Sequence, residues 1–236
     1  MFLNLIIKFY SDFKLDLIQL QEVMKMSLRF SEEEFSRLKE LLFSYEWALR
    51  TMMTKLDIIR EAFKLSQDTS PIGYIACRVK TPESIAGKLH KQNYGLTAVN
   101  AKKYLKDIAG IRIICPYARD IYFLAGLIRE MPDAIILSEK DYVTKPKPSG
   151  YRSYHIIMEI PIYHSSKTET VPIEIQIRTE AMNFWATLEH QAKYKYKEHI
   201  PQHLSDELIV CADKIAELDN RMFLIYETIS IINNEG

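Results

Sequence analysis

Hydrophobic side chains recur at steps of three and four residues along two long stretches, one near each end of the chain. In the first, Ser31 is followed three residues later by Glu34, a spacing typical of a helix start whose free backbone N–H groups are bound by side chains. The periodic positions continue to about Leu65, so we expect a long amphipathic helix. We expect a second long helix from Ser205 to about Ile232, with an apolar stripe of Leu208, Ala212, Ile215, Leu218, Met222 and Ile225.

Between these stretches the hydrophobic runs are shorter and rich in β-branched residues, which is typical of strands. The clearest run reads VPIEIQIR, in which isoleucines alternate with polar residues, so the two kinds of side chain would lie on opposite faces of a strand. We expect strands at Gly110–Cys115, Ala134–Lys140, Tyr154–Ile162 and Val171–Arg178. Shorter helices are expected from Thr81 to about Lys91, from Asp120 to Met131 and from Thr179 to about Tyr196.

This order of helices, then a mixed centre, then helices predicts an α+β fold. We expect a mixed, largely antiparallel central sheet flanked by helices, with the long helices at the N- and C-terminal ends. Residues 31–236 are expected to form a single domain, and residues 1–30 an N-terminal extension outside it.

Composition limits the classes of function. The 236 residues include 31 basic and 31 acidic side chains, so a net charge of zero argues against a protein that coats DNA or a membrane surface by charge alone. No apolar run approaches the length of a membrane span. The three cysteines are far apart in sequence, which argues against a disulfide framework or a zinc site and favours a cytoplasmic protein.

The segment KPKPSGYRSYH, from Lys145 to His155, concentrates cations, rings and stiff backbone. Its prolines restrict the chain and Gly150 permits unusual backbone angles. Its cations, Lys145, Lys147 and Arg152, could bind phosphates, and Tyr151 and Tyr154 offer flat faces for a base. A nucleotide clamp and a plain basic turn between two strands explain this composition about equally well.

Two carboxylates stand beside predicted strands. In DIAGIR, Asp107 precedes a strand at a place where an aspartate can hold Mg²⁺, but a simple helix-to-strand turn would look the same. In EIQIRT, Glu174 could bind a metal ion or accept a proton, while Gln176 and Arg178 share its face. The alternative is the solvent side of a half-buried strand.

RVKTPESIAGK places cations directly before a predicted helix start. Arg78 and Lys80 precede that helix, and Ser84 and Lys88 share one of its faces. A phosphate site and a solvated basic edge explain this arrangement about equally well. The chain contains neither the Walker nor the Rossmann glycine motif.

The segment MNFWATLEHQAKYKYK reads as an amphipathic helix. In it, Met182, Trp185 and Leu188 fit a buried stripe, and Asn183 and Glu189 fall on other faces.

The order of these motifs along the chain is more specific than any one of them. Arg-x-Lys-x-x-x-Ser, Asp-x-x-Gly-x-Arg, KPSGYRSYH, Glu-x-Gln-x-Arg-Thr and Phe-Trp-Ala-x-x-Glu-His follow one another between about Glu33 and Arg221. This series resembles the nucleotidyltransferase-like synthetase domain of the RelA/SpoT family, and in particular a RelP-type small alarmone synthetase. The resemblance implies a GTP diphosphokinase that transfers the β,γ-pyrophosphate of ATP to the 3′-hydroxyl of GDP or GTP, making ppGpp or pppGpp.

The resemblance also implies roles for single residues. Arg78 and Arg112 would sandwich the adenine of ATP. Asp107 and Glu174 would bind Mg²⁺, and Glu174 would help to deprotonate the acceptor hydroxyl. The ATP phosphates would be held by Lys80, Ser84 and Lys88. The GDP or GTP site would contain Lys145 and Lys147 at the phosphates, Tyr151 stacked on guanine, His155, Gln176 and Arg178 lining the cleft, and Asn183 and Glu189 positioning the nucleoside.

At the level of the molecule, the resemblance implies a homotetramer built through the flanking helices, with no need of a ribosome. No His-Asp dipeptide of the family's hydrolase domain occurs, so we expect synthesis without hydrolysis. Two alternatives stay open: a pyrophosphokinase for another acceptor, either an adenosine nucleotide or the 3′ end of tRNA, and a non-catalytic regulator that binds nucleotides or RNA. The pair Asp107 and Glu174 argues against the regulator.

Overall fold

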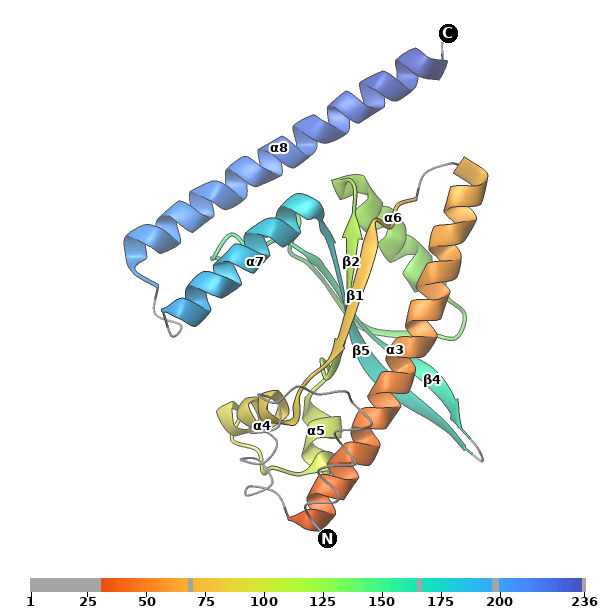
Figure 1. Cartoon of the computed structure of the whole chain (residues 1–236), viewed down its shortest axis with the longest axis vertical. Helices are drawn as coiled ribbons and strands as arrows, with labels where there is room; N and C mark the ends of the chain where they lie inside the picture. Colours follow the sequence, from red (N-terminus) through yellow and green to blue (C-terminus); the bar gives the residue numbers. More distant parts are fainter. Residues whose placement is uncertain (1–30, 68–69, 165–166, 197–199, 235–236) are drawn as a thin grey trace. The chain divides into compact units, whose positions relative to one another are not determined.

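The computed structural model describes residues 31–67, 70–164, 167–196 and 200–234 (Figure 1), so the predicted N-terminal extension, residues 1–30, lies outside the described residues. This part of the chain contains helices and one five-stranded sheet, which confirms the predicted α+β class. The elements in chain order are α3 (Glu32–Gln67), β1 (Tyr74–Val79), α4 (Pro82–Lys91), α5 (Ala98–Tyr104), β2 (Ala109–Cys115), α6 (Ala118–Arg129), β3 (Ile135–Asp141), β4 (Tyr154–His164), β5 (Lys167–Thr179), α7 (Glu180–Lys195) and α8 (Gln202–Asn234).

The strand order in the sheet is β1-β2-β5-β4-β3. Backbone bonds from Gly73 to Ile114 and from Lys80 to Ile108 pair rising with falling numbers, so β1 and β2 run antiparallel. β4 and β5 are neighbours separated by two residues in sequence, which also requires opposite directions. The largely antiparallel sheet is therefore as predicted.

The alternating pattern predicted for the central strands is seen in their burial. Along β5, Ile173, Ile175 and Ile177 have no exposed surface, while Glu174 and Gln176 between them are half-buried. β4 buries every second residue from Tyr154 to Ile162 in the same way. One face of these strands thus supplies the core, and the other is left for polar side chains.

The chain divides into two compact units, and each is described by itself. Among the described residues, the first contains 31–52, Cys77–Gly110 and 159–174, and the second contains 53–76, Ile111–Met158 and those after Glu174. The expectation that residues 31–236 form a single domain stays a prediction.

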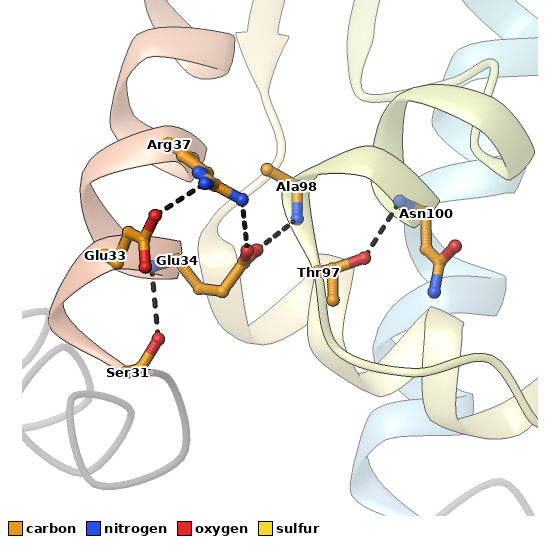
Figure 2. Close-up of polar contacts among 7 residues, drawn as sticks. All are labelled: Ser31, Glu33, Glu34, Arg37, Thr97, Ala98 and Asn100. Atoms are coloured by element: carbon orange, nitrogen blue, oxygen red, sulfur yellow. Dashed lines mark hydrogen bonds and ion pairs between the residues drawn. The ribbon is translucent and has the colours of Figure 1, made fainter.

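In the first unit, α3 begins as predicted at Ser31, whose hydroxyl accepts a bond of 3.2 Å from the Glu34 backbone N–H (Figure 2). The Glu34 carboxylate, however, has a different partner from the one that a capping box implies. It accepts a bond of 3.1 Å from the backbone N–H of Ala98 and pairs with Arg37 at 3.1 Å. Glu34 thereby binds a free N–H group at the start of α5 and connects α3 to α5.

α4 starts as its sequence predicts. The Thr81 side chain accepts a bond from the Ser84 backbone N–H, and Pro82 occupies the first turn. Ile85, Ala86 and Leu89 are buried, so the opposite side of this short helix is free to present polar residues.

In the second unit, α7 and α8 lie side by side (Figure 1). The indole N–H of Trp185 donates to the Leu208 carbonyl at 2.8 Å, and Trp185 forms a core cluster with Ala186 and Ala212. The predicted stripe on α7 was wrong at one position, because Leu188 is 44% exposed and Glu189 is 8% exposed. Residue 189 lies seven positions after Met182, and therefore returns to the same helix face, whereas residue 188 does not.

The stripe predicted for α8 divides into two parts. Leu208, Ala212 and Ile215 lie on or in the Trp185 cluster. Farther along the helix, Leu218, Met222 and Ile225 are each more than half exposed, so this part of α8 presents an apolar face to its surroundings.

Two elements were not predicted. β1 has no alternation of buried and exposed residues to detect, because it is largely exposed. α5 is only seven residues long, and its single clear signal is Thr97, whose side chain accepts from the Asn100 backbone N–H. None of the described helices is long and apolar enough to cross a membrane.

Candidate active site

Three of the predicted phosphate and metal residues meet in the first unit, and we call them the lysine–aspartate cluster: Lys80, Lys88 and Asp107. Lys80 directly follows β1, Lys88 lies half-buried on α4, and Asp107 precedes β2. Both lysine ammonium groups donate to Oδ2 of Asp107, at 2.7 Å from Lys80 and 2.6 Å from Lys88. Lys80 also donates to the Asp107 carbonyl at 2.7 Å.

The lysine–aspartate cluster contains two positively charged groups and only one negatively charged group. Burial by itself would raise the pKa of the Asp107 carboxyl, but the hydrogen bonds and charges of the two lysines outweigh burial and hold the pKa below its ordinary value. The second oxygen, Oδ1, is buried and accepts no hydrogen bond from the described residues. Two cations thus share one carboxylate oxygen, and the other oxygen is an unused acceptor.

The other residues that the sequence assigns to ATP and the metal ion lie on four different elements, β1, α4, β5 and β2. Arg78 is exposed on β1, and Ser84 is exposed on α4 with its hydroxyl 3.1 Å from that of Thr81. Glu174 is half-buried on β5, between two buried isoleucines. Arg112, on β2, is half-buried, and its Nε is a buried donor without an acceptor among the described residues.

A second group, the tyrosine cluster, forms in the second unit from Tyr142, Lys147, Tyr151, His155 and Arg178. The Tyr151 hydroxyl lies 2.9 Å from Nε2 of His155 and accepts a hydrogen bond from the Arg178 guanidinium. The same guanidinium donates to Gln176 at 2.7 Å and lies 4.9 Å from the centre of the Tyr151 ring. Arg178 is only 4% exposed, so it holds the tyrosine from within the fold.

Lys147 lies over two rings of this cluster. Its ammonium is 4.7 Å from the centre of the Tyr142 ring and 4.8 Å from that of Tyr151. At exposed sites, the attraction between a cation and an aromatic face stabilises such a contact by about 1 kcal/mol. Tyr142 also meets His155 edge-on, with ring centres 5.2 Å apart. Sequence reasoning missed Tyr142, because it precedes the lysine- and proline-rich segment and carries no motif of its own.

The last three predicted acceptor residues lie outside this contact network as described. Asn183 on α7 donates to the Tyr74 hydroxyl at 3.0 Å, and its Oδ1 is buried with no donor among the described residues. Glu189 is buried and paired with Lys193. Lys145 is exposed in the loop between β3 and β4.

Two hollows in the surface of the described residues are lined by other side chains than those of the two clusters. One cavity of about 620 Å³ is bordered by residues such as Tyr117, Arg119 and Tyr226, and one of about 460 Å³ by residues such as Trp47, Lys102 and His164. The described residues hold no group of three or more His, Cys, Asp or Glu side chains arranged for a metal ion.

Comparison with known proteins identifies the family. A family profile described as "Region found in RelA / SpoT proteins" matches residues 77–199, which is more than half of the chain and includes both clusters. The chain belongs to the RelA/SpoT family. Its predicted membership is thus confirmed, while the RelP-type subgroup stays a prediction.

A named relative and two solved structures are similar to this RelA/SpoT protein along most of their length. GTP pyrophosphokinase YwaC of Bacillus subtilis (strain 168) is 41% identical over 184 residues, which cover 78% of this chain and 88% of that protein. The crystal structure of small alarmone synthetase 2 from Bacillus subtilis matches with a TM-score of 0.74 and 39% identity, over 80% of this chain and 98% of that one. Small alarmone synthetase 1 from the same organism, bound to its product pppGpp, matches with a TM-score of 0.73 and 34% identity, over 78% and 94%.

Proposed function

We propose that this chain is a GTP diphosphokinase that transfers the β,γ-pyrophosphate of ATP to the 3′-hydroxyl of GDP or GTP, making ppGpp or pppGpp. The names of its relatives support this assignment. The observation that carries it is the lysine–aspartate cluster, where two cations and one unused carboxylate oxygen suit a polyphosphate and its metal ion. Pyrophosphoryl transfer needs mainly such positioning and charge neutralisation from the protein.

On the donor side, Lys80 and Lys88 pass from Asp107 to the phosphates of ATP. A triphosphate carries more negative charge than one carboxylate, so it competes effectively for both ammonium groups. Ser84, exposed on the same helix, adds a hydroxyl donor. Arg78 and the partly buried Arg112 bind the adenine by stacking their planar guanidinium groups on it.

Asp107 and Glu174 would hold Mg²⁺. The buried, unbonded Oδ1 of Asp107 fits a metal ligand, because hard carboxylate oxygens are what Mg²⁺ prefers. The ion would supply neutralisation of the phosphate charge that grows during transfer. Glu174 is half-buried on the polar face of β5, and we assign to it the proton of the acceptor hydroxyl.

On the acceptor side, guanine stacks on Tyr151. The Lys147 ammonium, which lies over that ring in the described structure, then moves to the acceptor phosphates together with Lys145. Arg178, His155 and Gln176 keep the tyrosine in place through the bonds described above.

Asn183 and Glu189 position the acceptor nucleoside. The Asn183 Oδ1, a buried acceptor without a donor, fits an N–H or O–H group of that nucleoside.

Several broader properties belong to the same proposal. The exposed apolar part of α8 supports a homotetramer assembled through its helices. The chain's location in the cytoplasm, its synthesis without hydrolysis and its independence of the ribosome stay predictions.

The test is transfer of label from γ-radiolabelled ATP, with Mg²⁺ and the purified full chain, separately to GDP, GTP, AMP and bulk tRNA. We expect label on GDP or GTP, and its loss in Glu174→Gln and after Mg²⁺ is removed with EDTA. Label only on AMP or tRNA would overturn the acceptor assignment and keep the donor site. Binding of ATP without any transfer would favour the non-catalytic regulator.

A further inference from the structure

Arg152 fastens the loop that carries Tyr151 at two places. We call residues 142–153, between β3 and β4, the acceptor loop. The Arg152 guanidinium donates to the Val143 carbonyl at 2.8 Å, which ties the end of the loop to its beginning. It also donates to Oδ1 of Asp213 at 3.1 Å, which ties the loop to α8. Arg152 is mostly buried, so few water molecules can compete with Val143 and Asp213 for hydrogen bonds from its guanidinium.

The neighbouring Gly150 is in direct contact with the same helix. Its φ of +89° lies in the region that favours glycine, and it is buried. A Cβ at this position would come 2.7 Å from the Cβ of Ala212 and 3.4 Å from Cα of Ile209. The loop backbone therefore lies against α8 with no room for a methyl group between them.

Tyr151 stands between these two attachments. Besides its polar partners, its ring packs against the cluster of Trp185, Ala186 and Ala212. The other end of the loop is held differently, because the Asp141 carboxylate accepts from the backbone N–H groups of Val143 and Thr144 at 2.8 and 3.0 Å. The tyrosine side of the loop thus depends on α8, whereas the β3 side is held by its own turn.

We propose that Ala212 and Asp213 of α8 are positioning residues that set the place of Tyr151 through Gly150 and Arg152, and so determine the affinity for the acceptor nucleotide. This inference rests on the proposed role of Tyr151 in stacking on guanine. Ala212 limits how far the loop can approach the helix, and Asp213 prevents it from moving away. Neither residue needs to touch a substrate.

Two variants of α8 test this role, and the readout is the KM for GDP against the KM for ATP. Ala212→Leu inserts bulk where the loop backbone lies, and we expect the KM for GDP to rise about tenfold or more. Asp213→Arg replaces the attraction to Arg152 by repulsion, and we expect a rise of about three- to tenfold at this exposed pair. In both variants the KM for ATP and the kcat at saturating GDP stay near those of the wild type.

Conservative and matched variants separate positioning from stability. Asp213→Glu keeps the negative charge, so its KM for GDP should be close to that of the wild type. Glu217→Ala removes another exposed carboxylate of α8, one that pairs with Arg221 of the same helix, and should leave both KM values unchanged. Thermal unfolding of each variant shows whether it is folded. Asp213→Arg changes only a surface side chain, so it keeps the test informative if Ala212→Leu does not fold.

The possible outcomes distinguish a failure of the positioning role from a failure of the proposed function. If Tyr151→Ala raises the KM for GDP while folded Ala212→Leu and Asp213→Arg do not, the positioning role is overturned and the proposed function stands. Equal rises of both KM values would overturn it as well. If Tyr151→Ala leaves the KM for GDP unchanged, the acceptor assignment itself fails and the positioning role fails with it.

Discussion

In the proposed donor site, the two oxygens of the Asp107 carboxylate have different roles. Its Oδ2 accepts from Lys80 and Lys88, and its buried Oδ1 accepts nothing among the described residues. An amide at this position would keep the shape and lose the charge. The two lysines would then face one another without a counter-ion, and a metal ion would lose its strongest protein ligand.

We therefore expect Asp107→Asn to lower kcat by about a hundredfold or more, because the change removes the charge of the proposed metal ligand. The measurement is product formation at saturating ATP and GDP. Asp133→Asn is a matched control, since Asp133 also pairs with a lysine, Lys55, but lies in neither cluster. Equal losses in the two variants would contradict the role of Asp107.

The lowered pKa of Asp107 also predicts a dependence of stability on pH. Because its pKa is lower in the folded state, Asp107 stabilises the fold above its ordinary pKa of 3.8, and this contribution is lost as the pH falls through the folded value. The free energy of unfolding should therefore fall more for the wild type than for Asp107→Asn between about pH 6 and pH 3.

Urea unfolding at several pH values measures this difference. Asp219 supplies a control of opposite sign, because burial raises its pKa. Relative to Asp219→Asn, the wild type should gain stability as the pH falls toward the ordinary pKa. If both differences changed in the same direction, the assignment of the Asp107 shift to its lysines would be wrong.

At the scale of elements, single side-chain and backbone contacts fix the helices and the loop that carry the candidate site residues. The Glu34 carboxylate on α3 binds the N-terminus of α5, and Thr81 and Thr179 cap α4 and α7. The acceptor loop depends on contact of Gly150 with α8. The contacts of Glu34 and Gly150 connect segments distant in sequence, whereas Thr81 and Thr179 bind backbone N–H groups three residues ahead, in the helix that each precedes.

We expect Gly150→Ala to destabilise the second unit by about 2–4 kcal/mol, since it combines strain at a positive φ with a clash against Ala212. Chemical denaturation measures the loss. Gly87→Ala is the matched control, because a Cβ there meets nothing within 4 Å in helix α4. That variant should be neutral or more stable by up to about 1 kcal/mol. A neutral Gly150→Ala would show that the loop is not seated on α8 as described.

At the scale of the whole molecule, a net charge of zero coexists with two local groups of cations. The lysine–aspartate and tyrosine clusters each gather their members from segments tens of residues apart. The positive charge that we propose to bind phosphates is therefore concentrated at particular sites and balanced by acidic residues elsewhere. The exposed apolar part of α8 is the other large-scale feature, and it favours association of copies of the chain.

We expect the double variant Met222→Glu/Ile229→Glu to lower the molar mass measured by light scattering after size exclusion, because both side chains are more than half exposed on α8. Their exposure means that a folded monomer loses little from the change. Val99→Glu, at an exposed apolar residue of α5, should leave the mass unchanged. A wild type that is itself monomeric, or a variant with unchanged mass, would contradict assembly through this face.

The sequence by itself determined most of the helices and most of the strands, since hydrophobic periodicity and caps such as Thr81-Pro82 are local signals. It also determined the family, because the order of five motifs is specific, and it identified Lys80, Lys88, Asp107 and Tyr151 as candidates. Only the tertiary structure decided that the two lysines share one oxygen of Asp107, that Glu34 caps a neighbouring helix, that Glu189 is buried in place of Leu188, and that Tyr142 and α8 support Tyr151. Those facts depend on contacts between residues far apart along the chain, which local patterns of polarity do not encode.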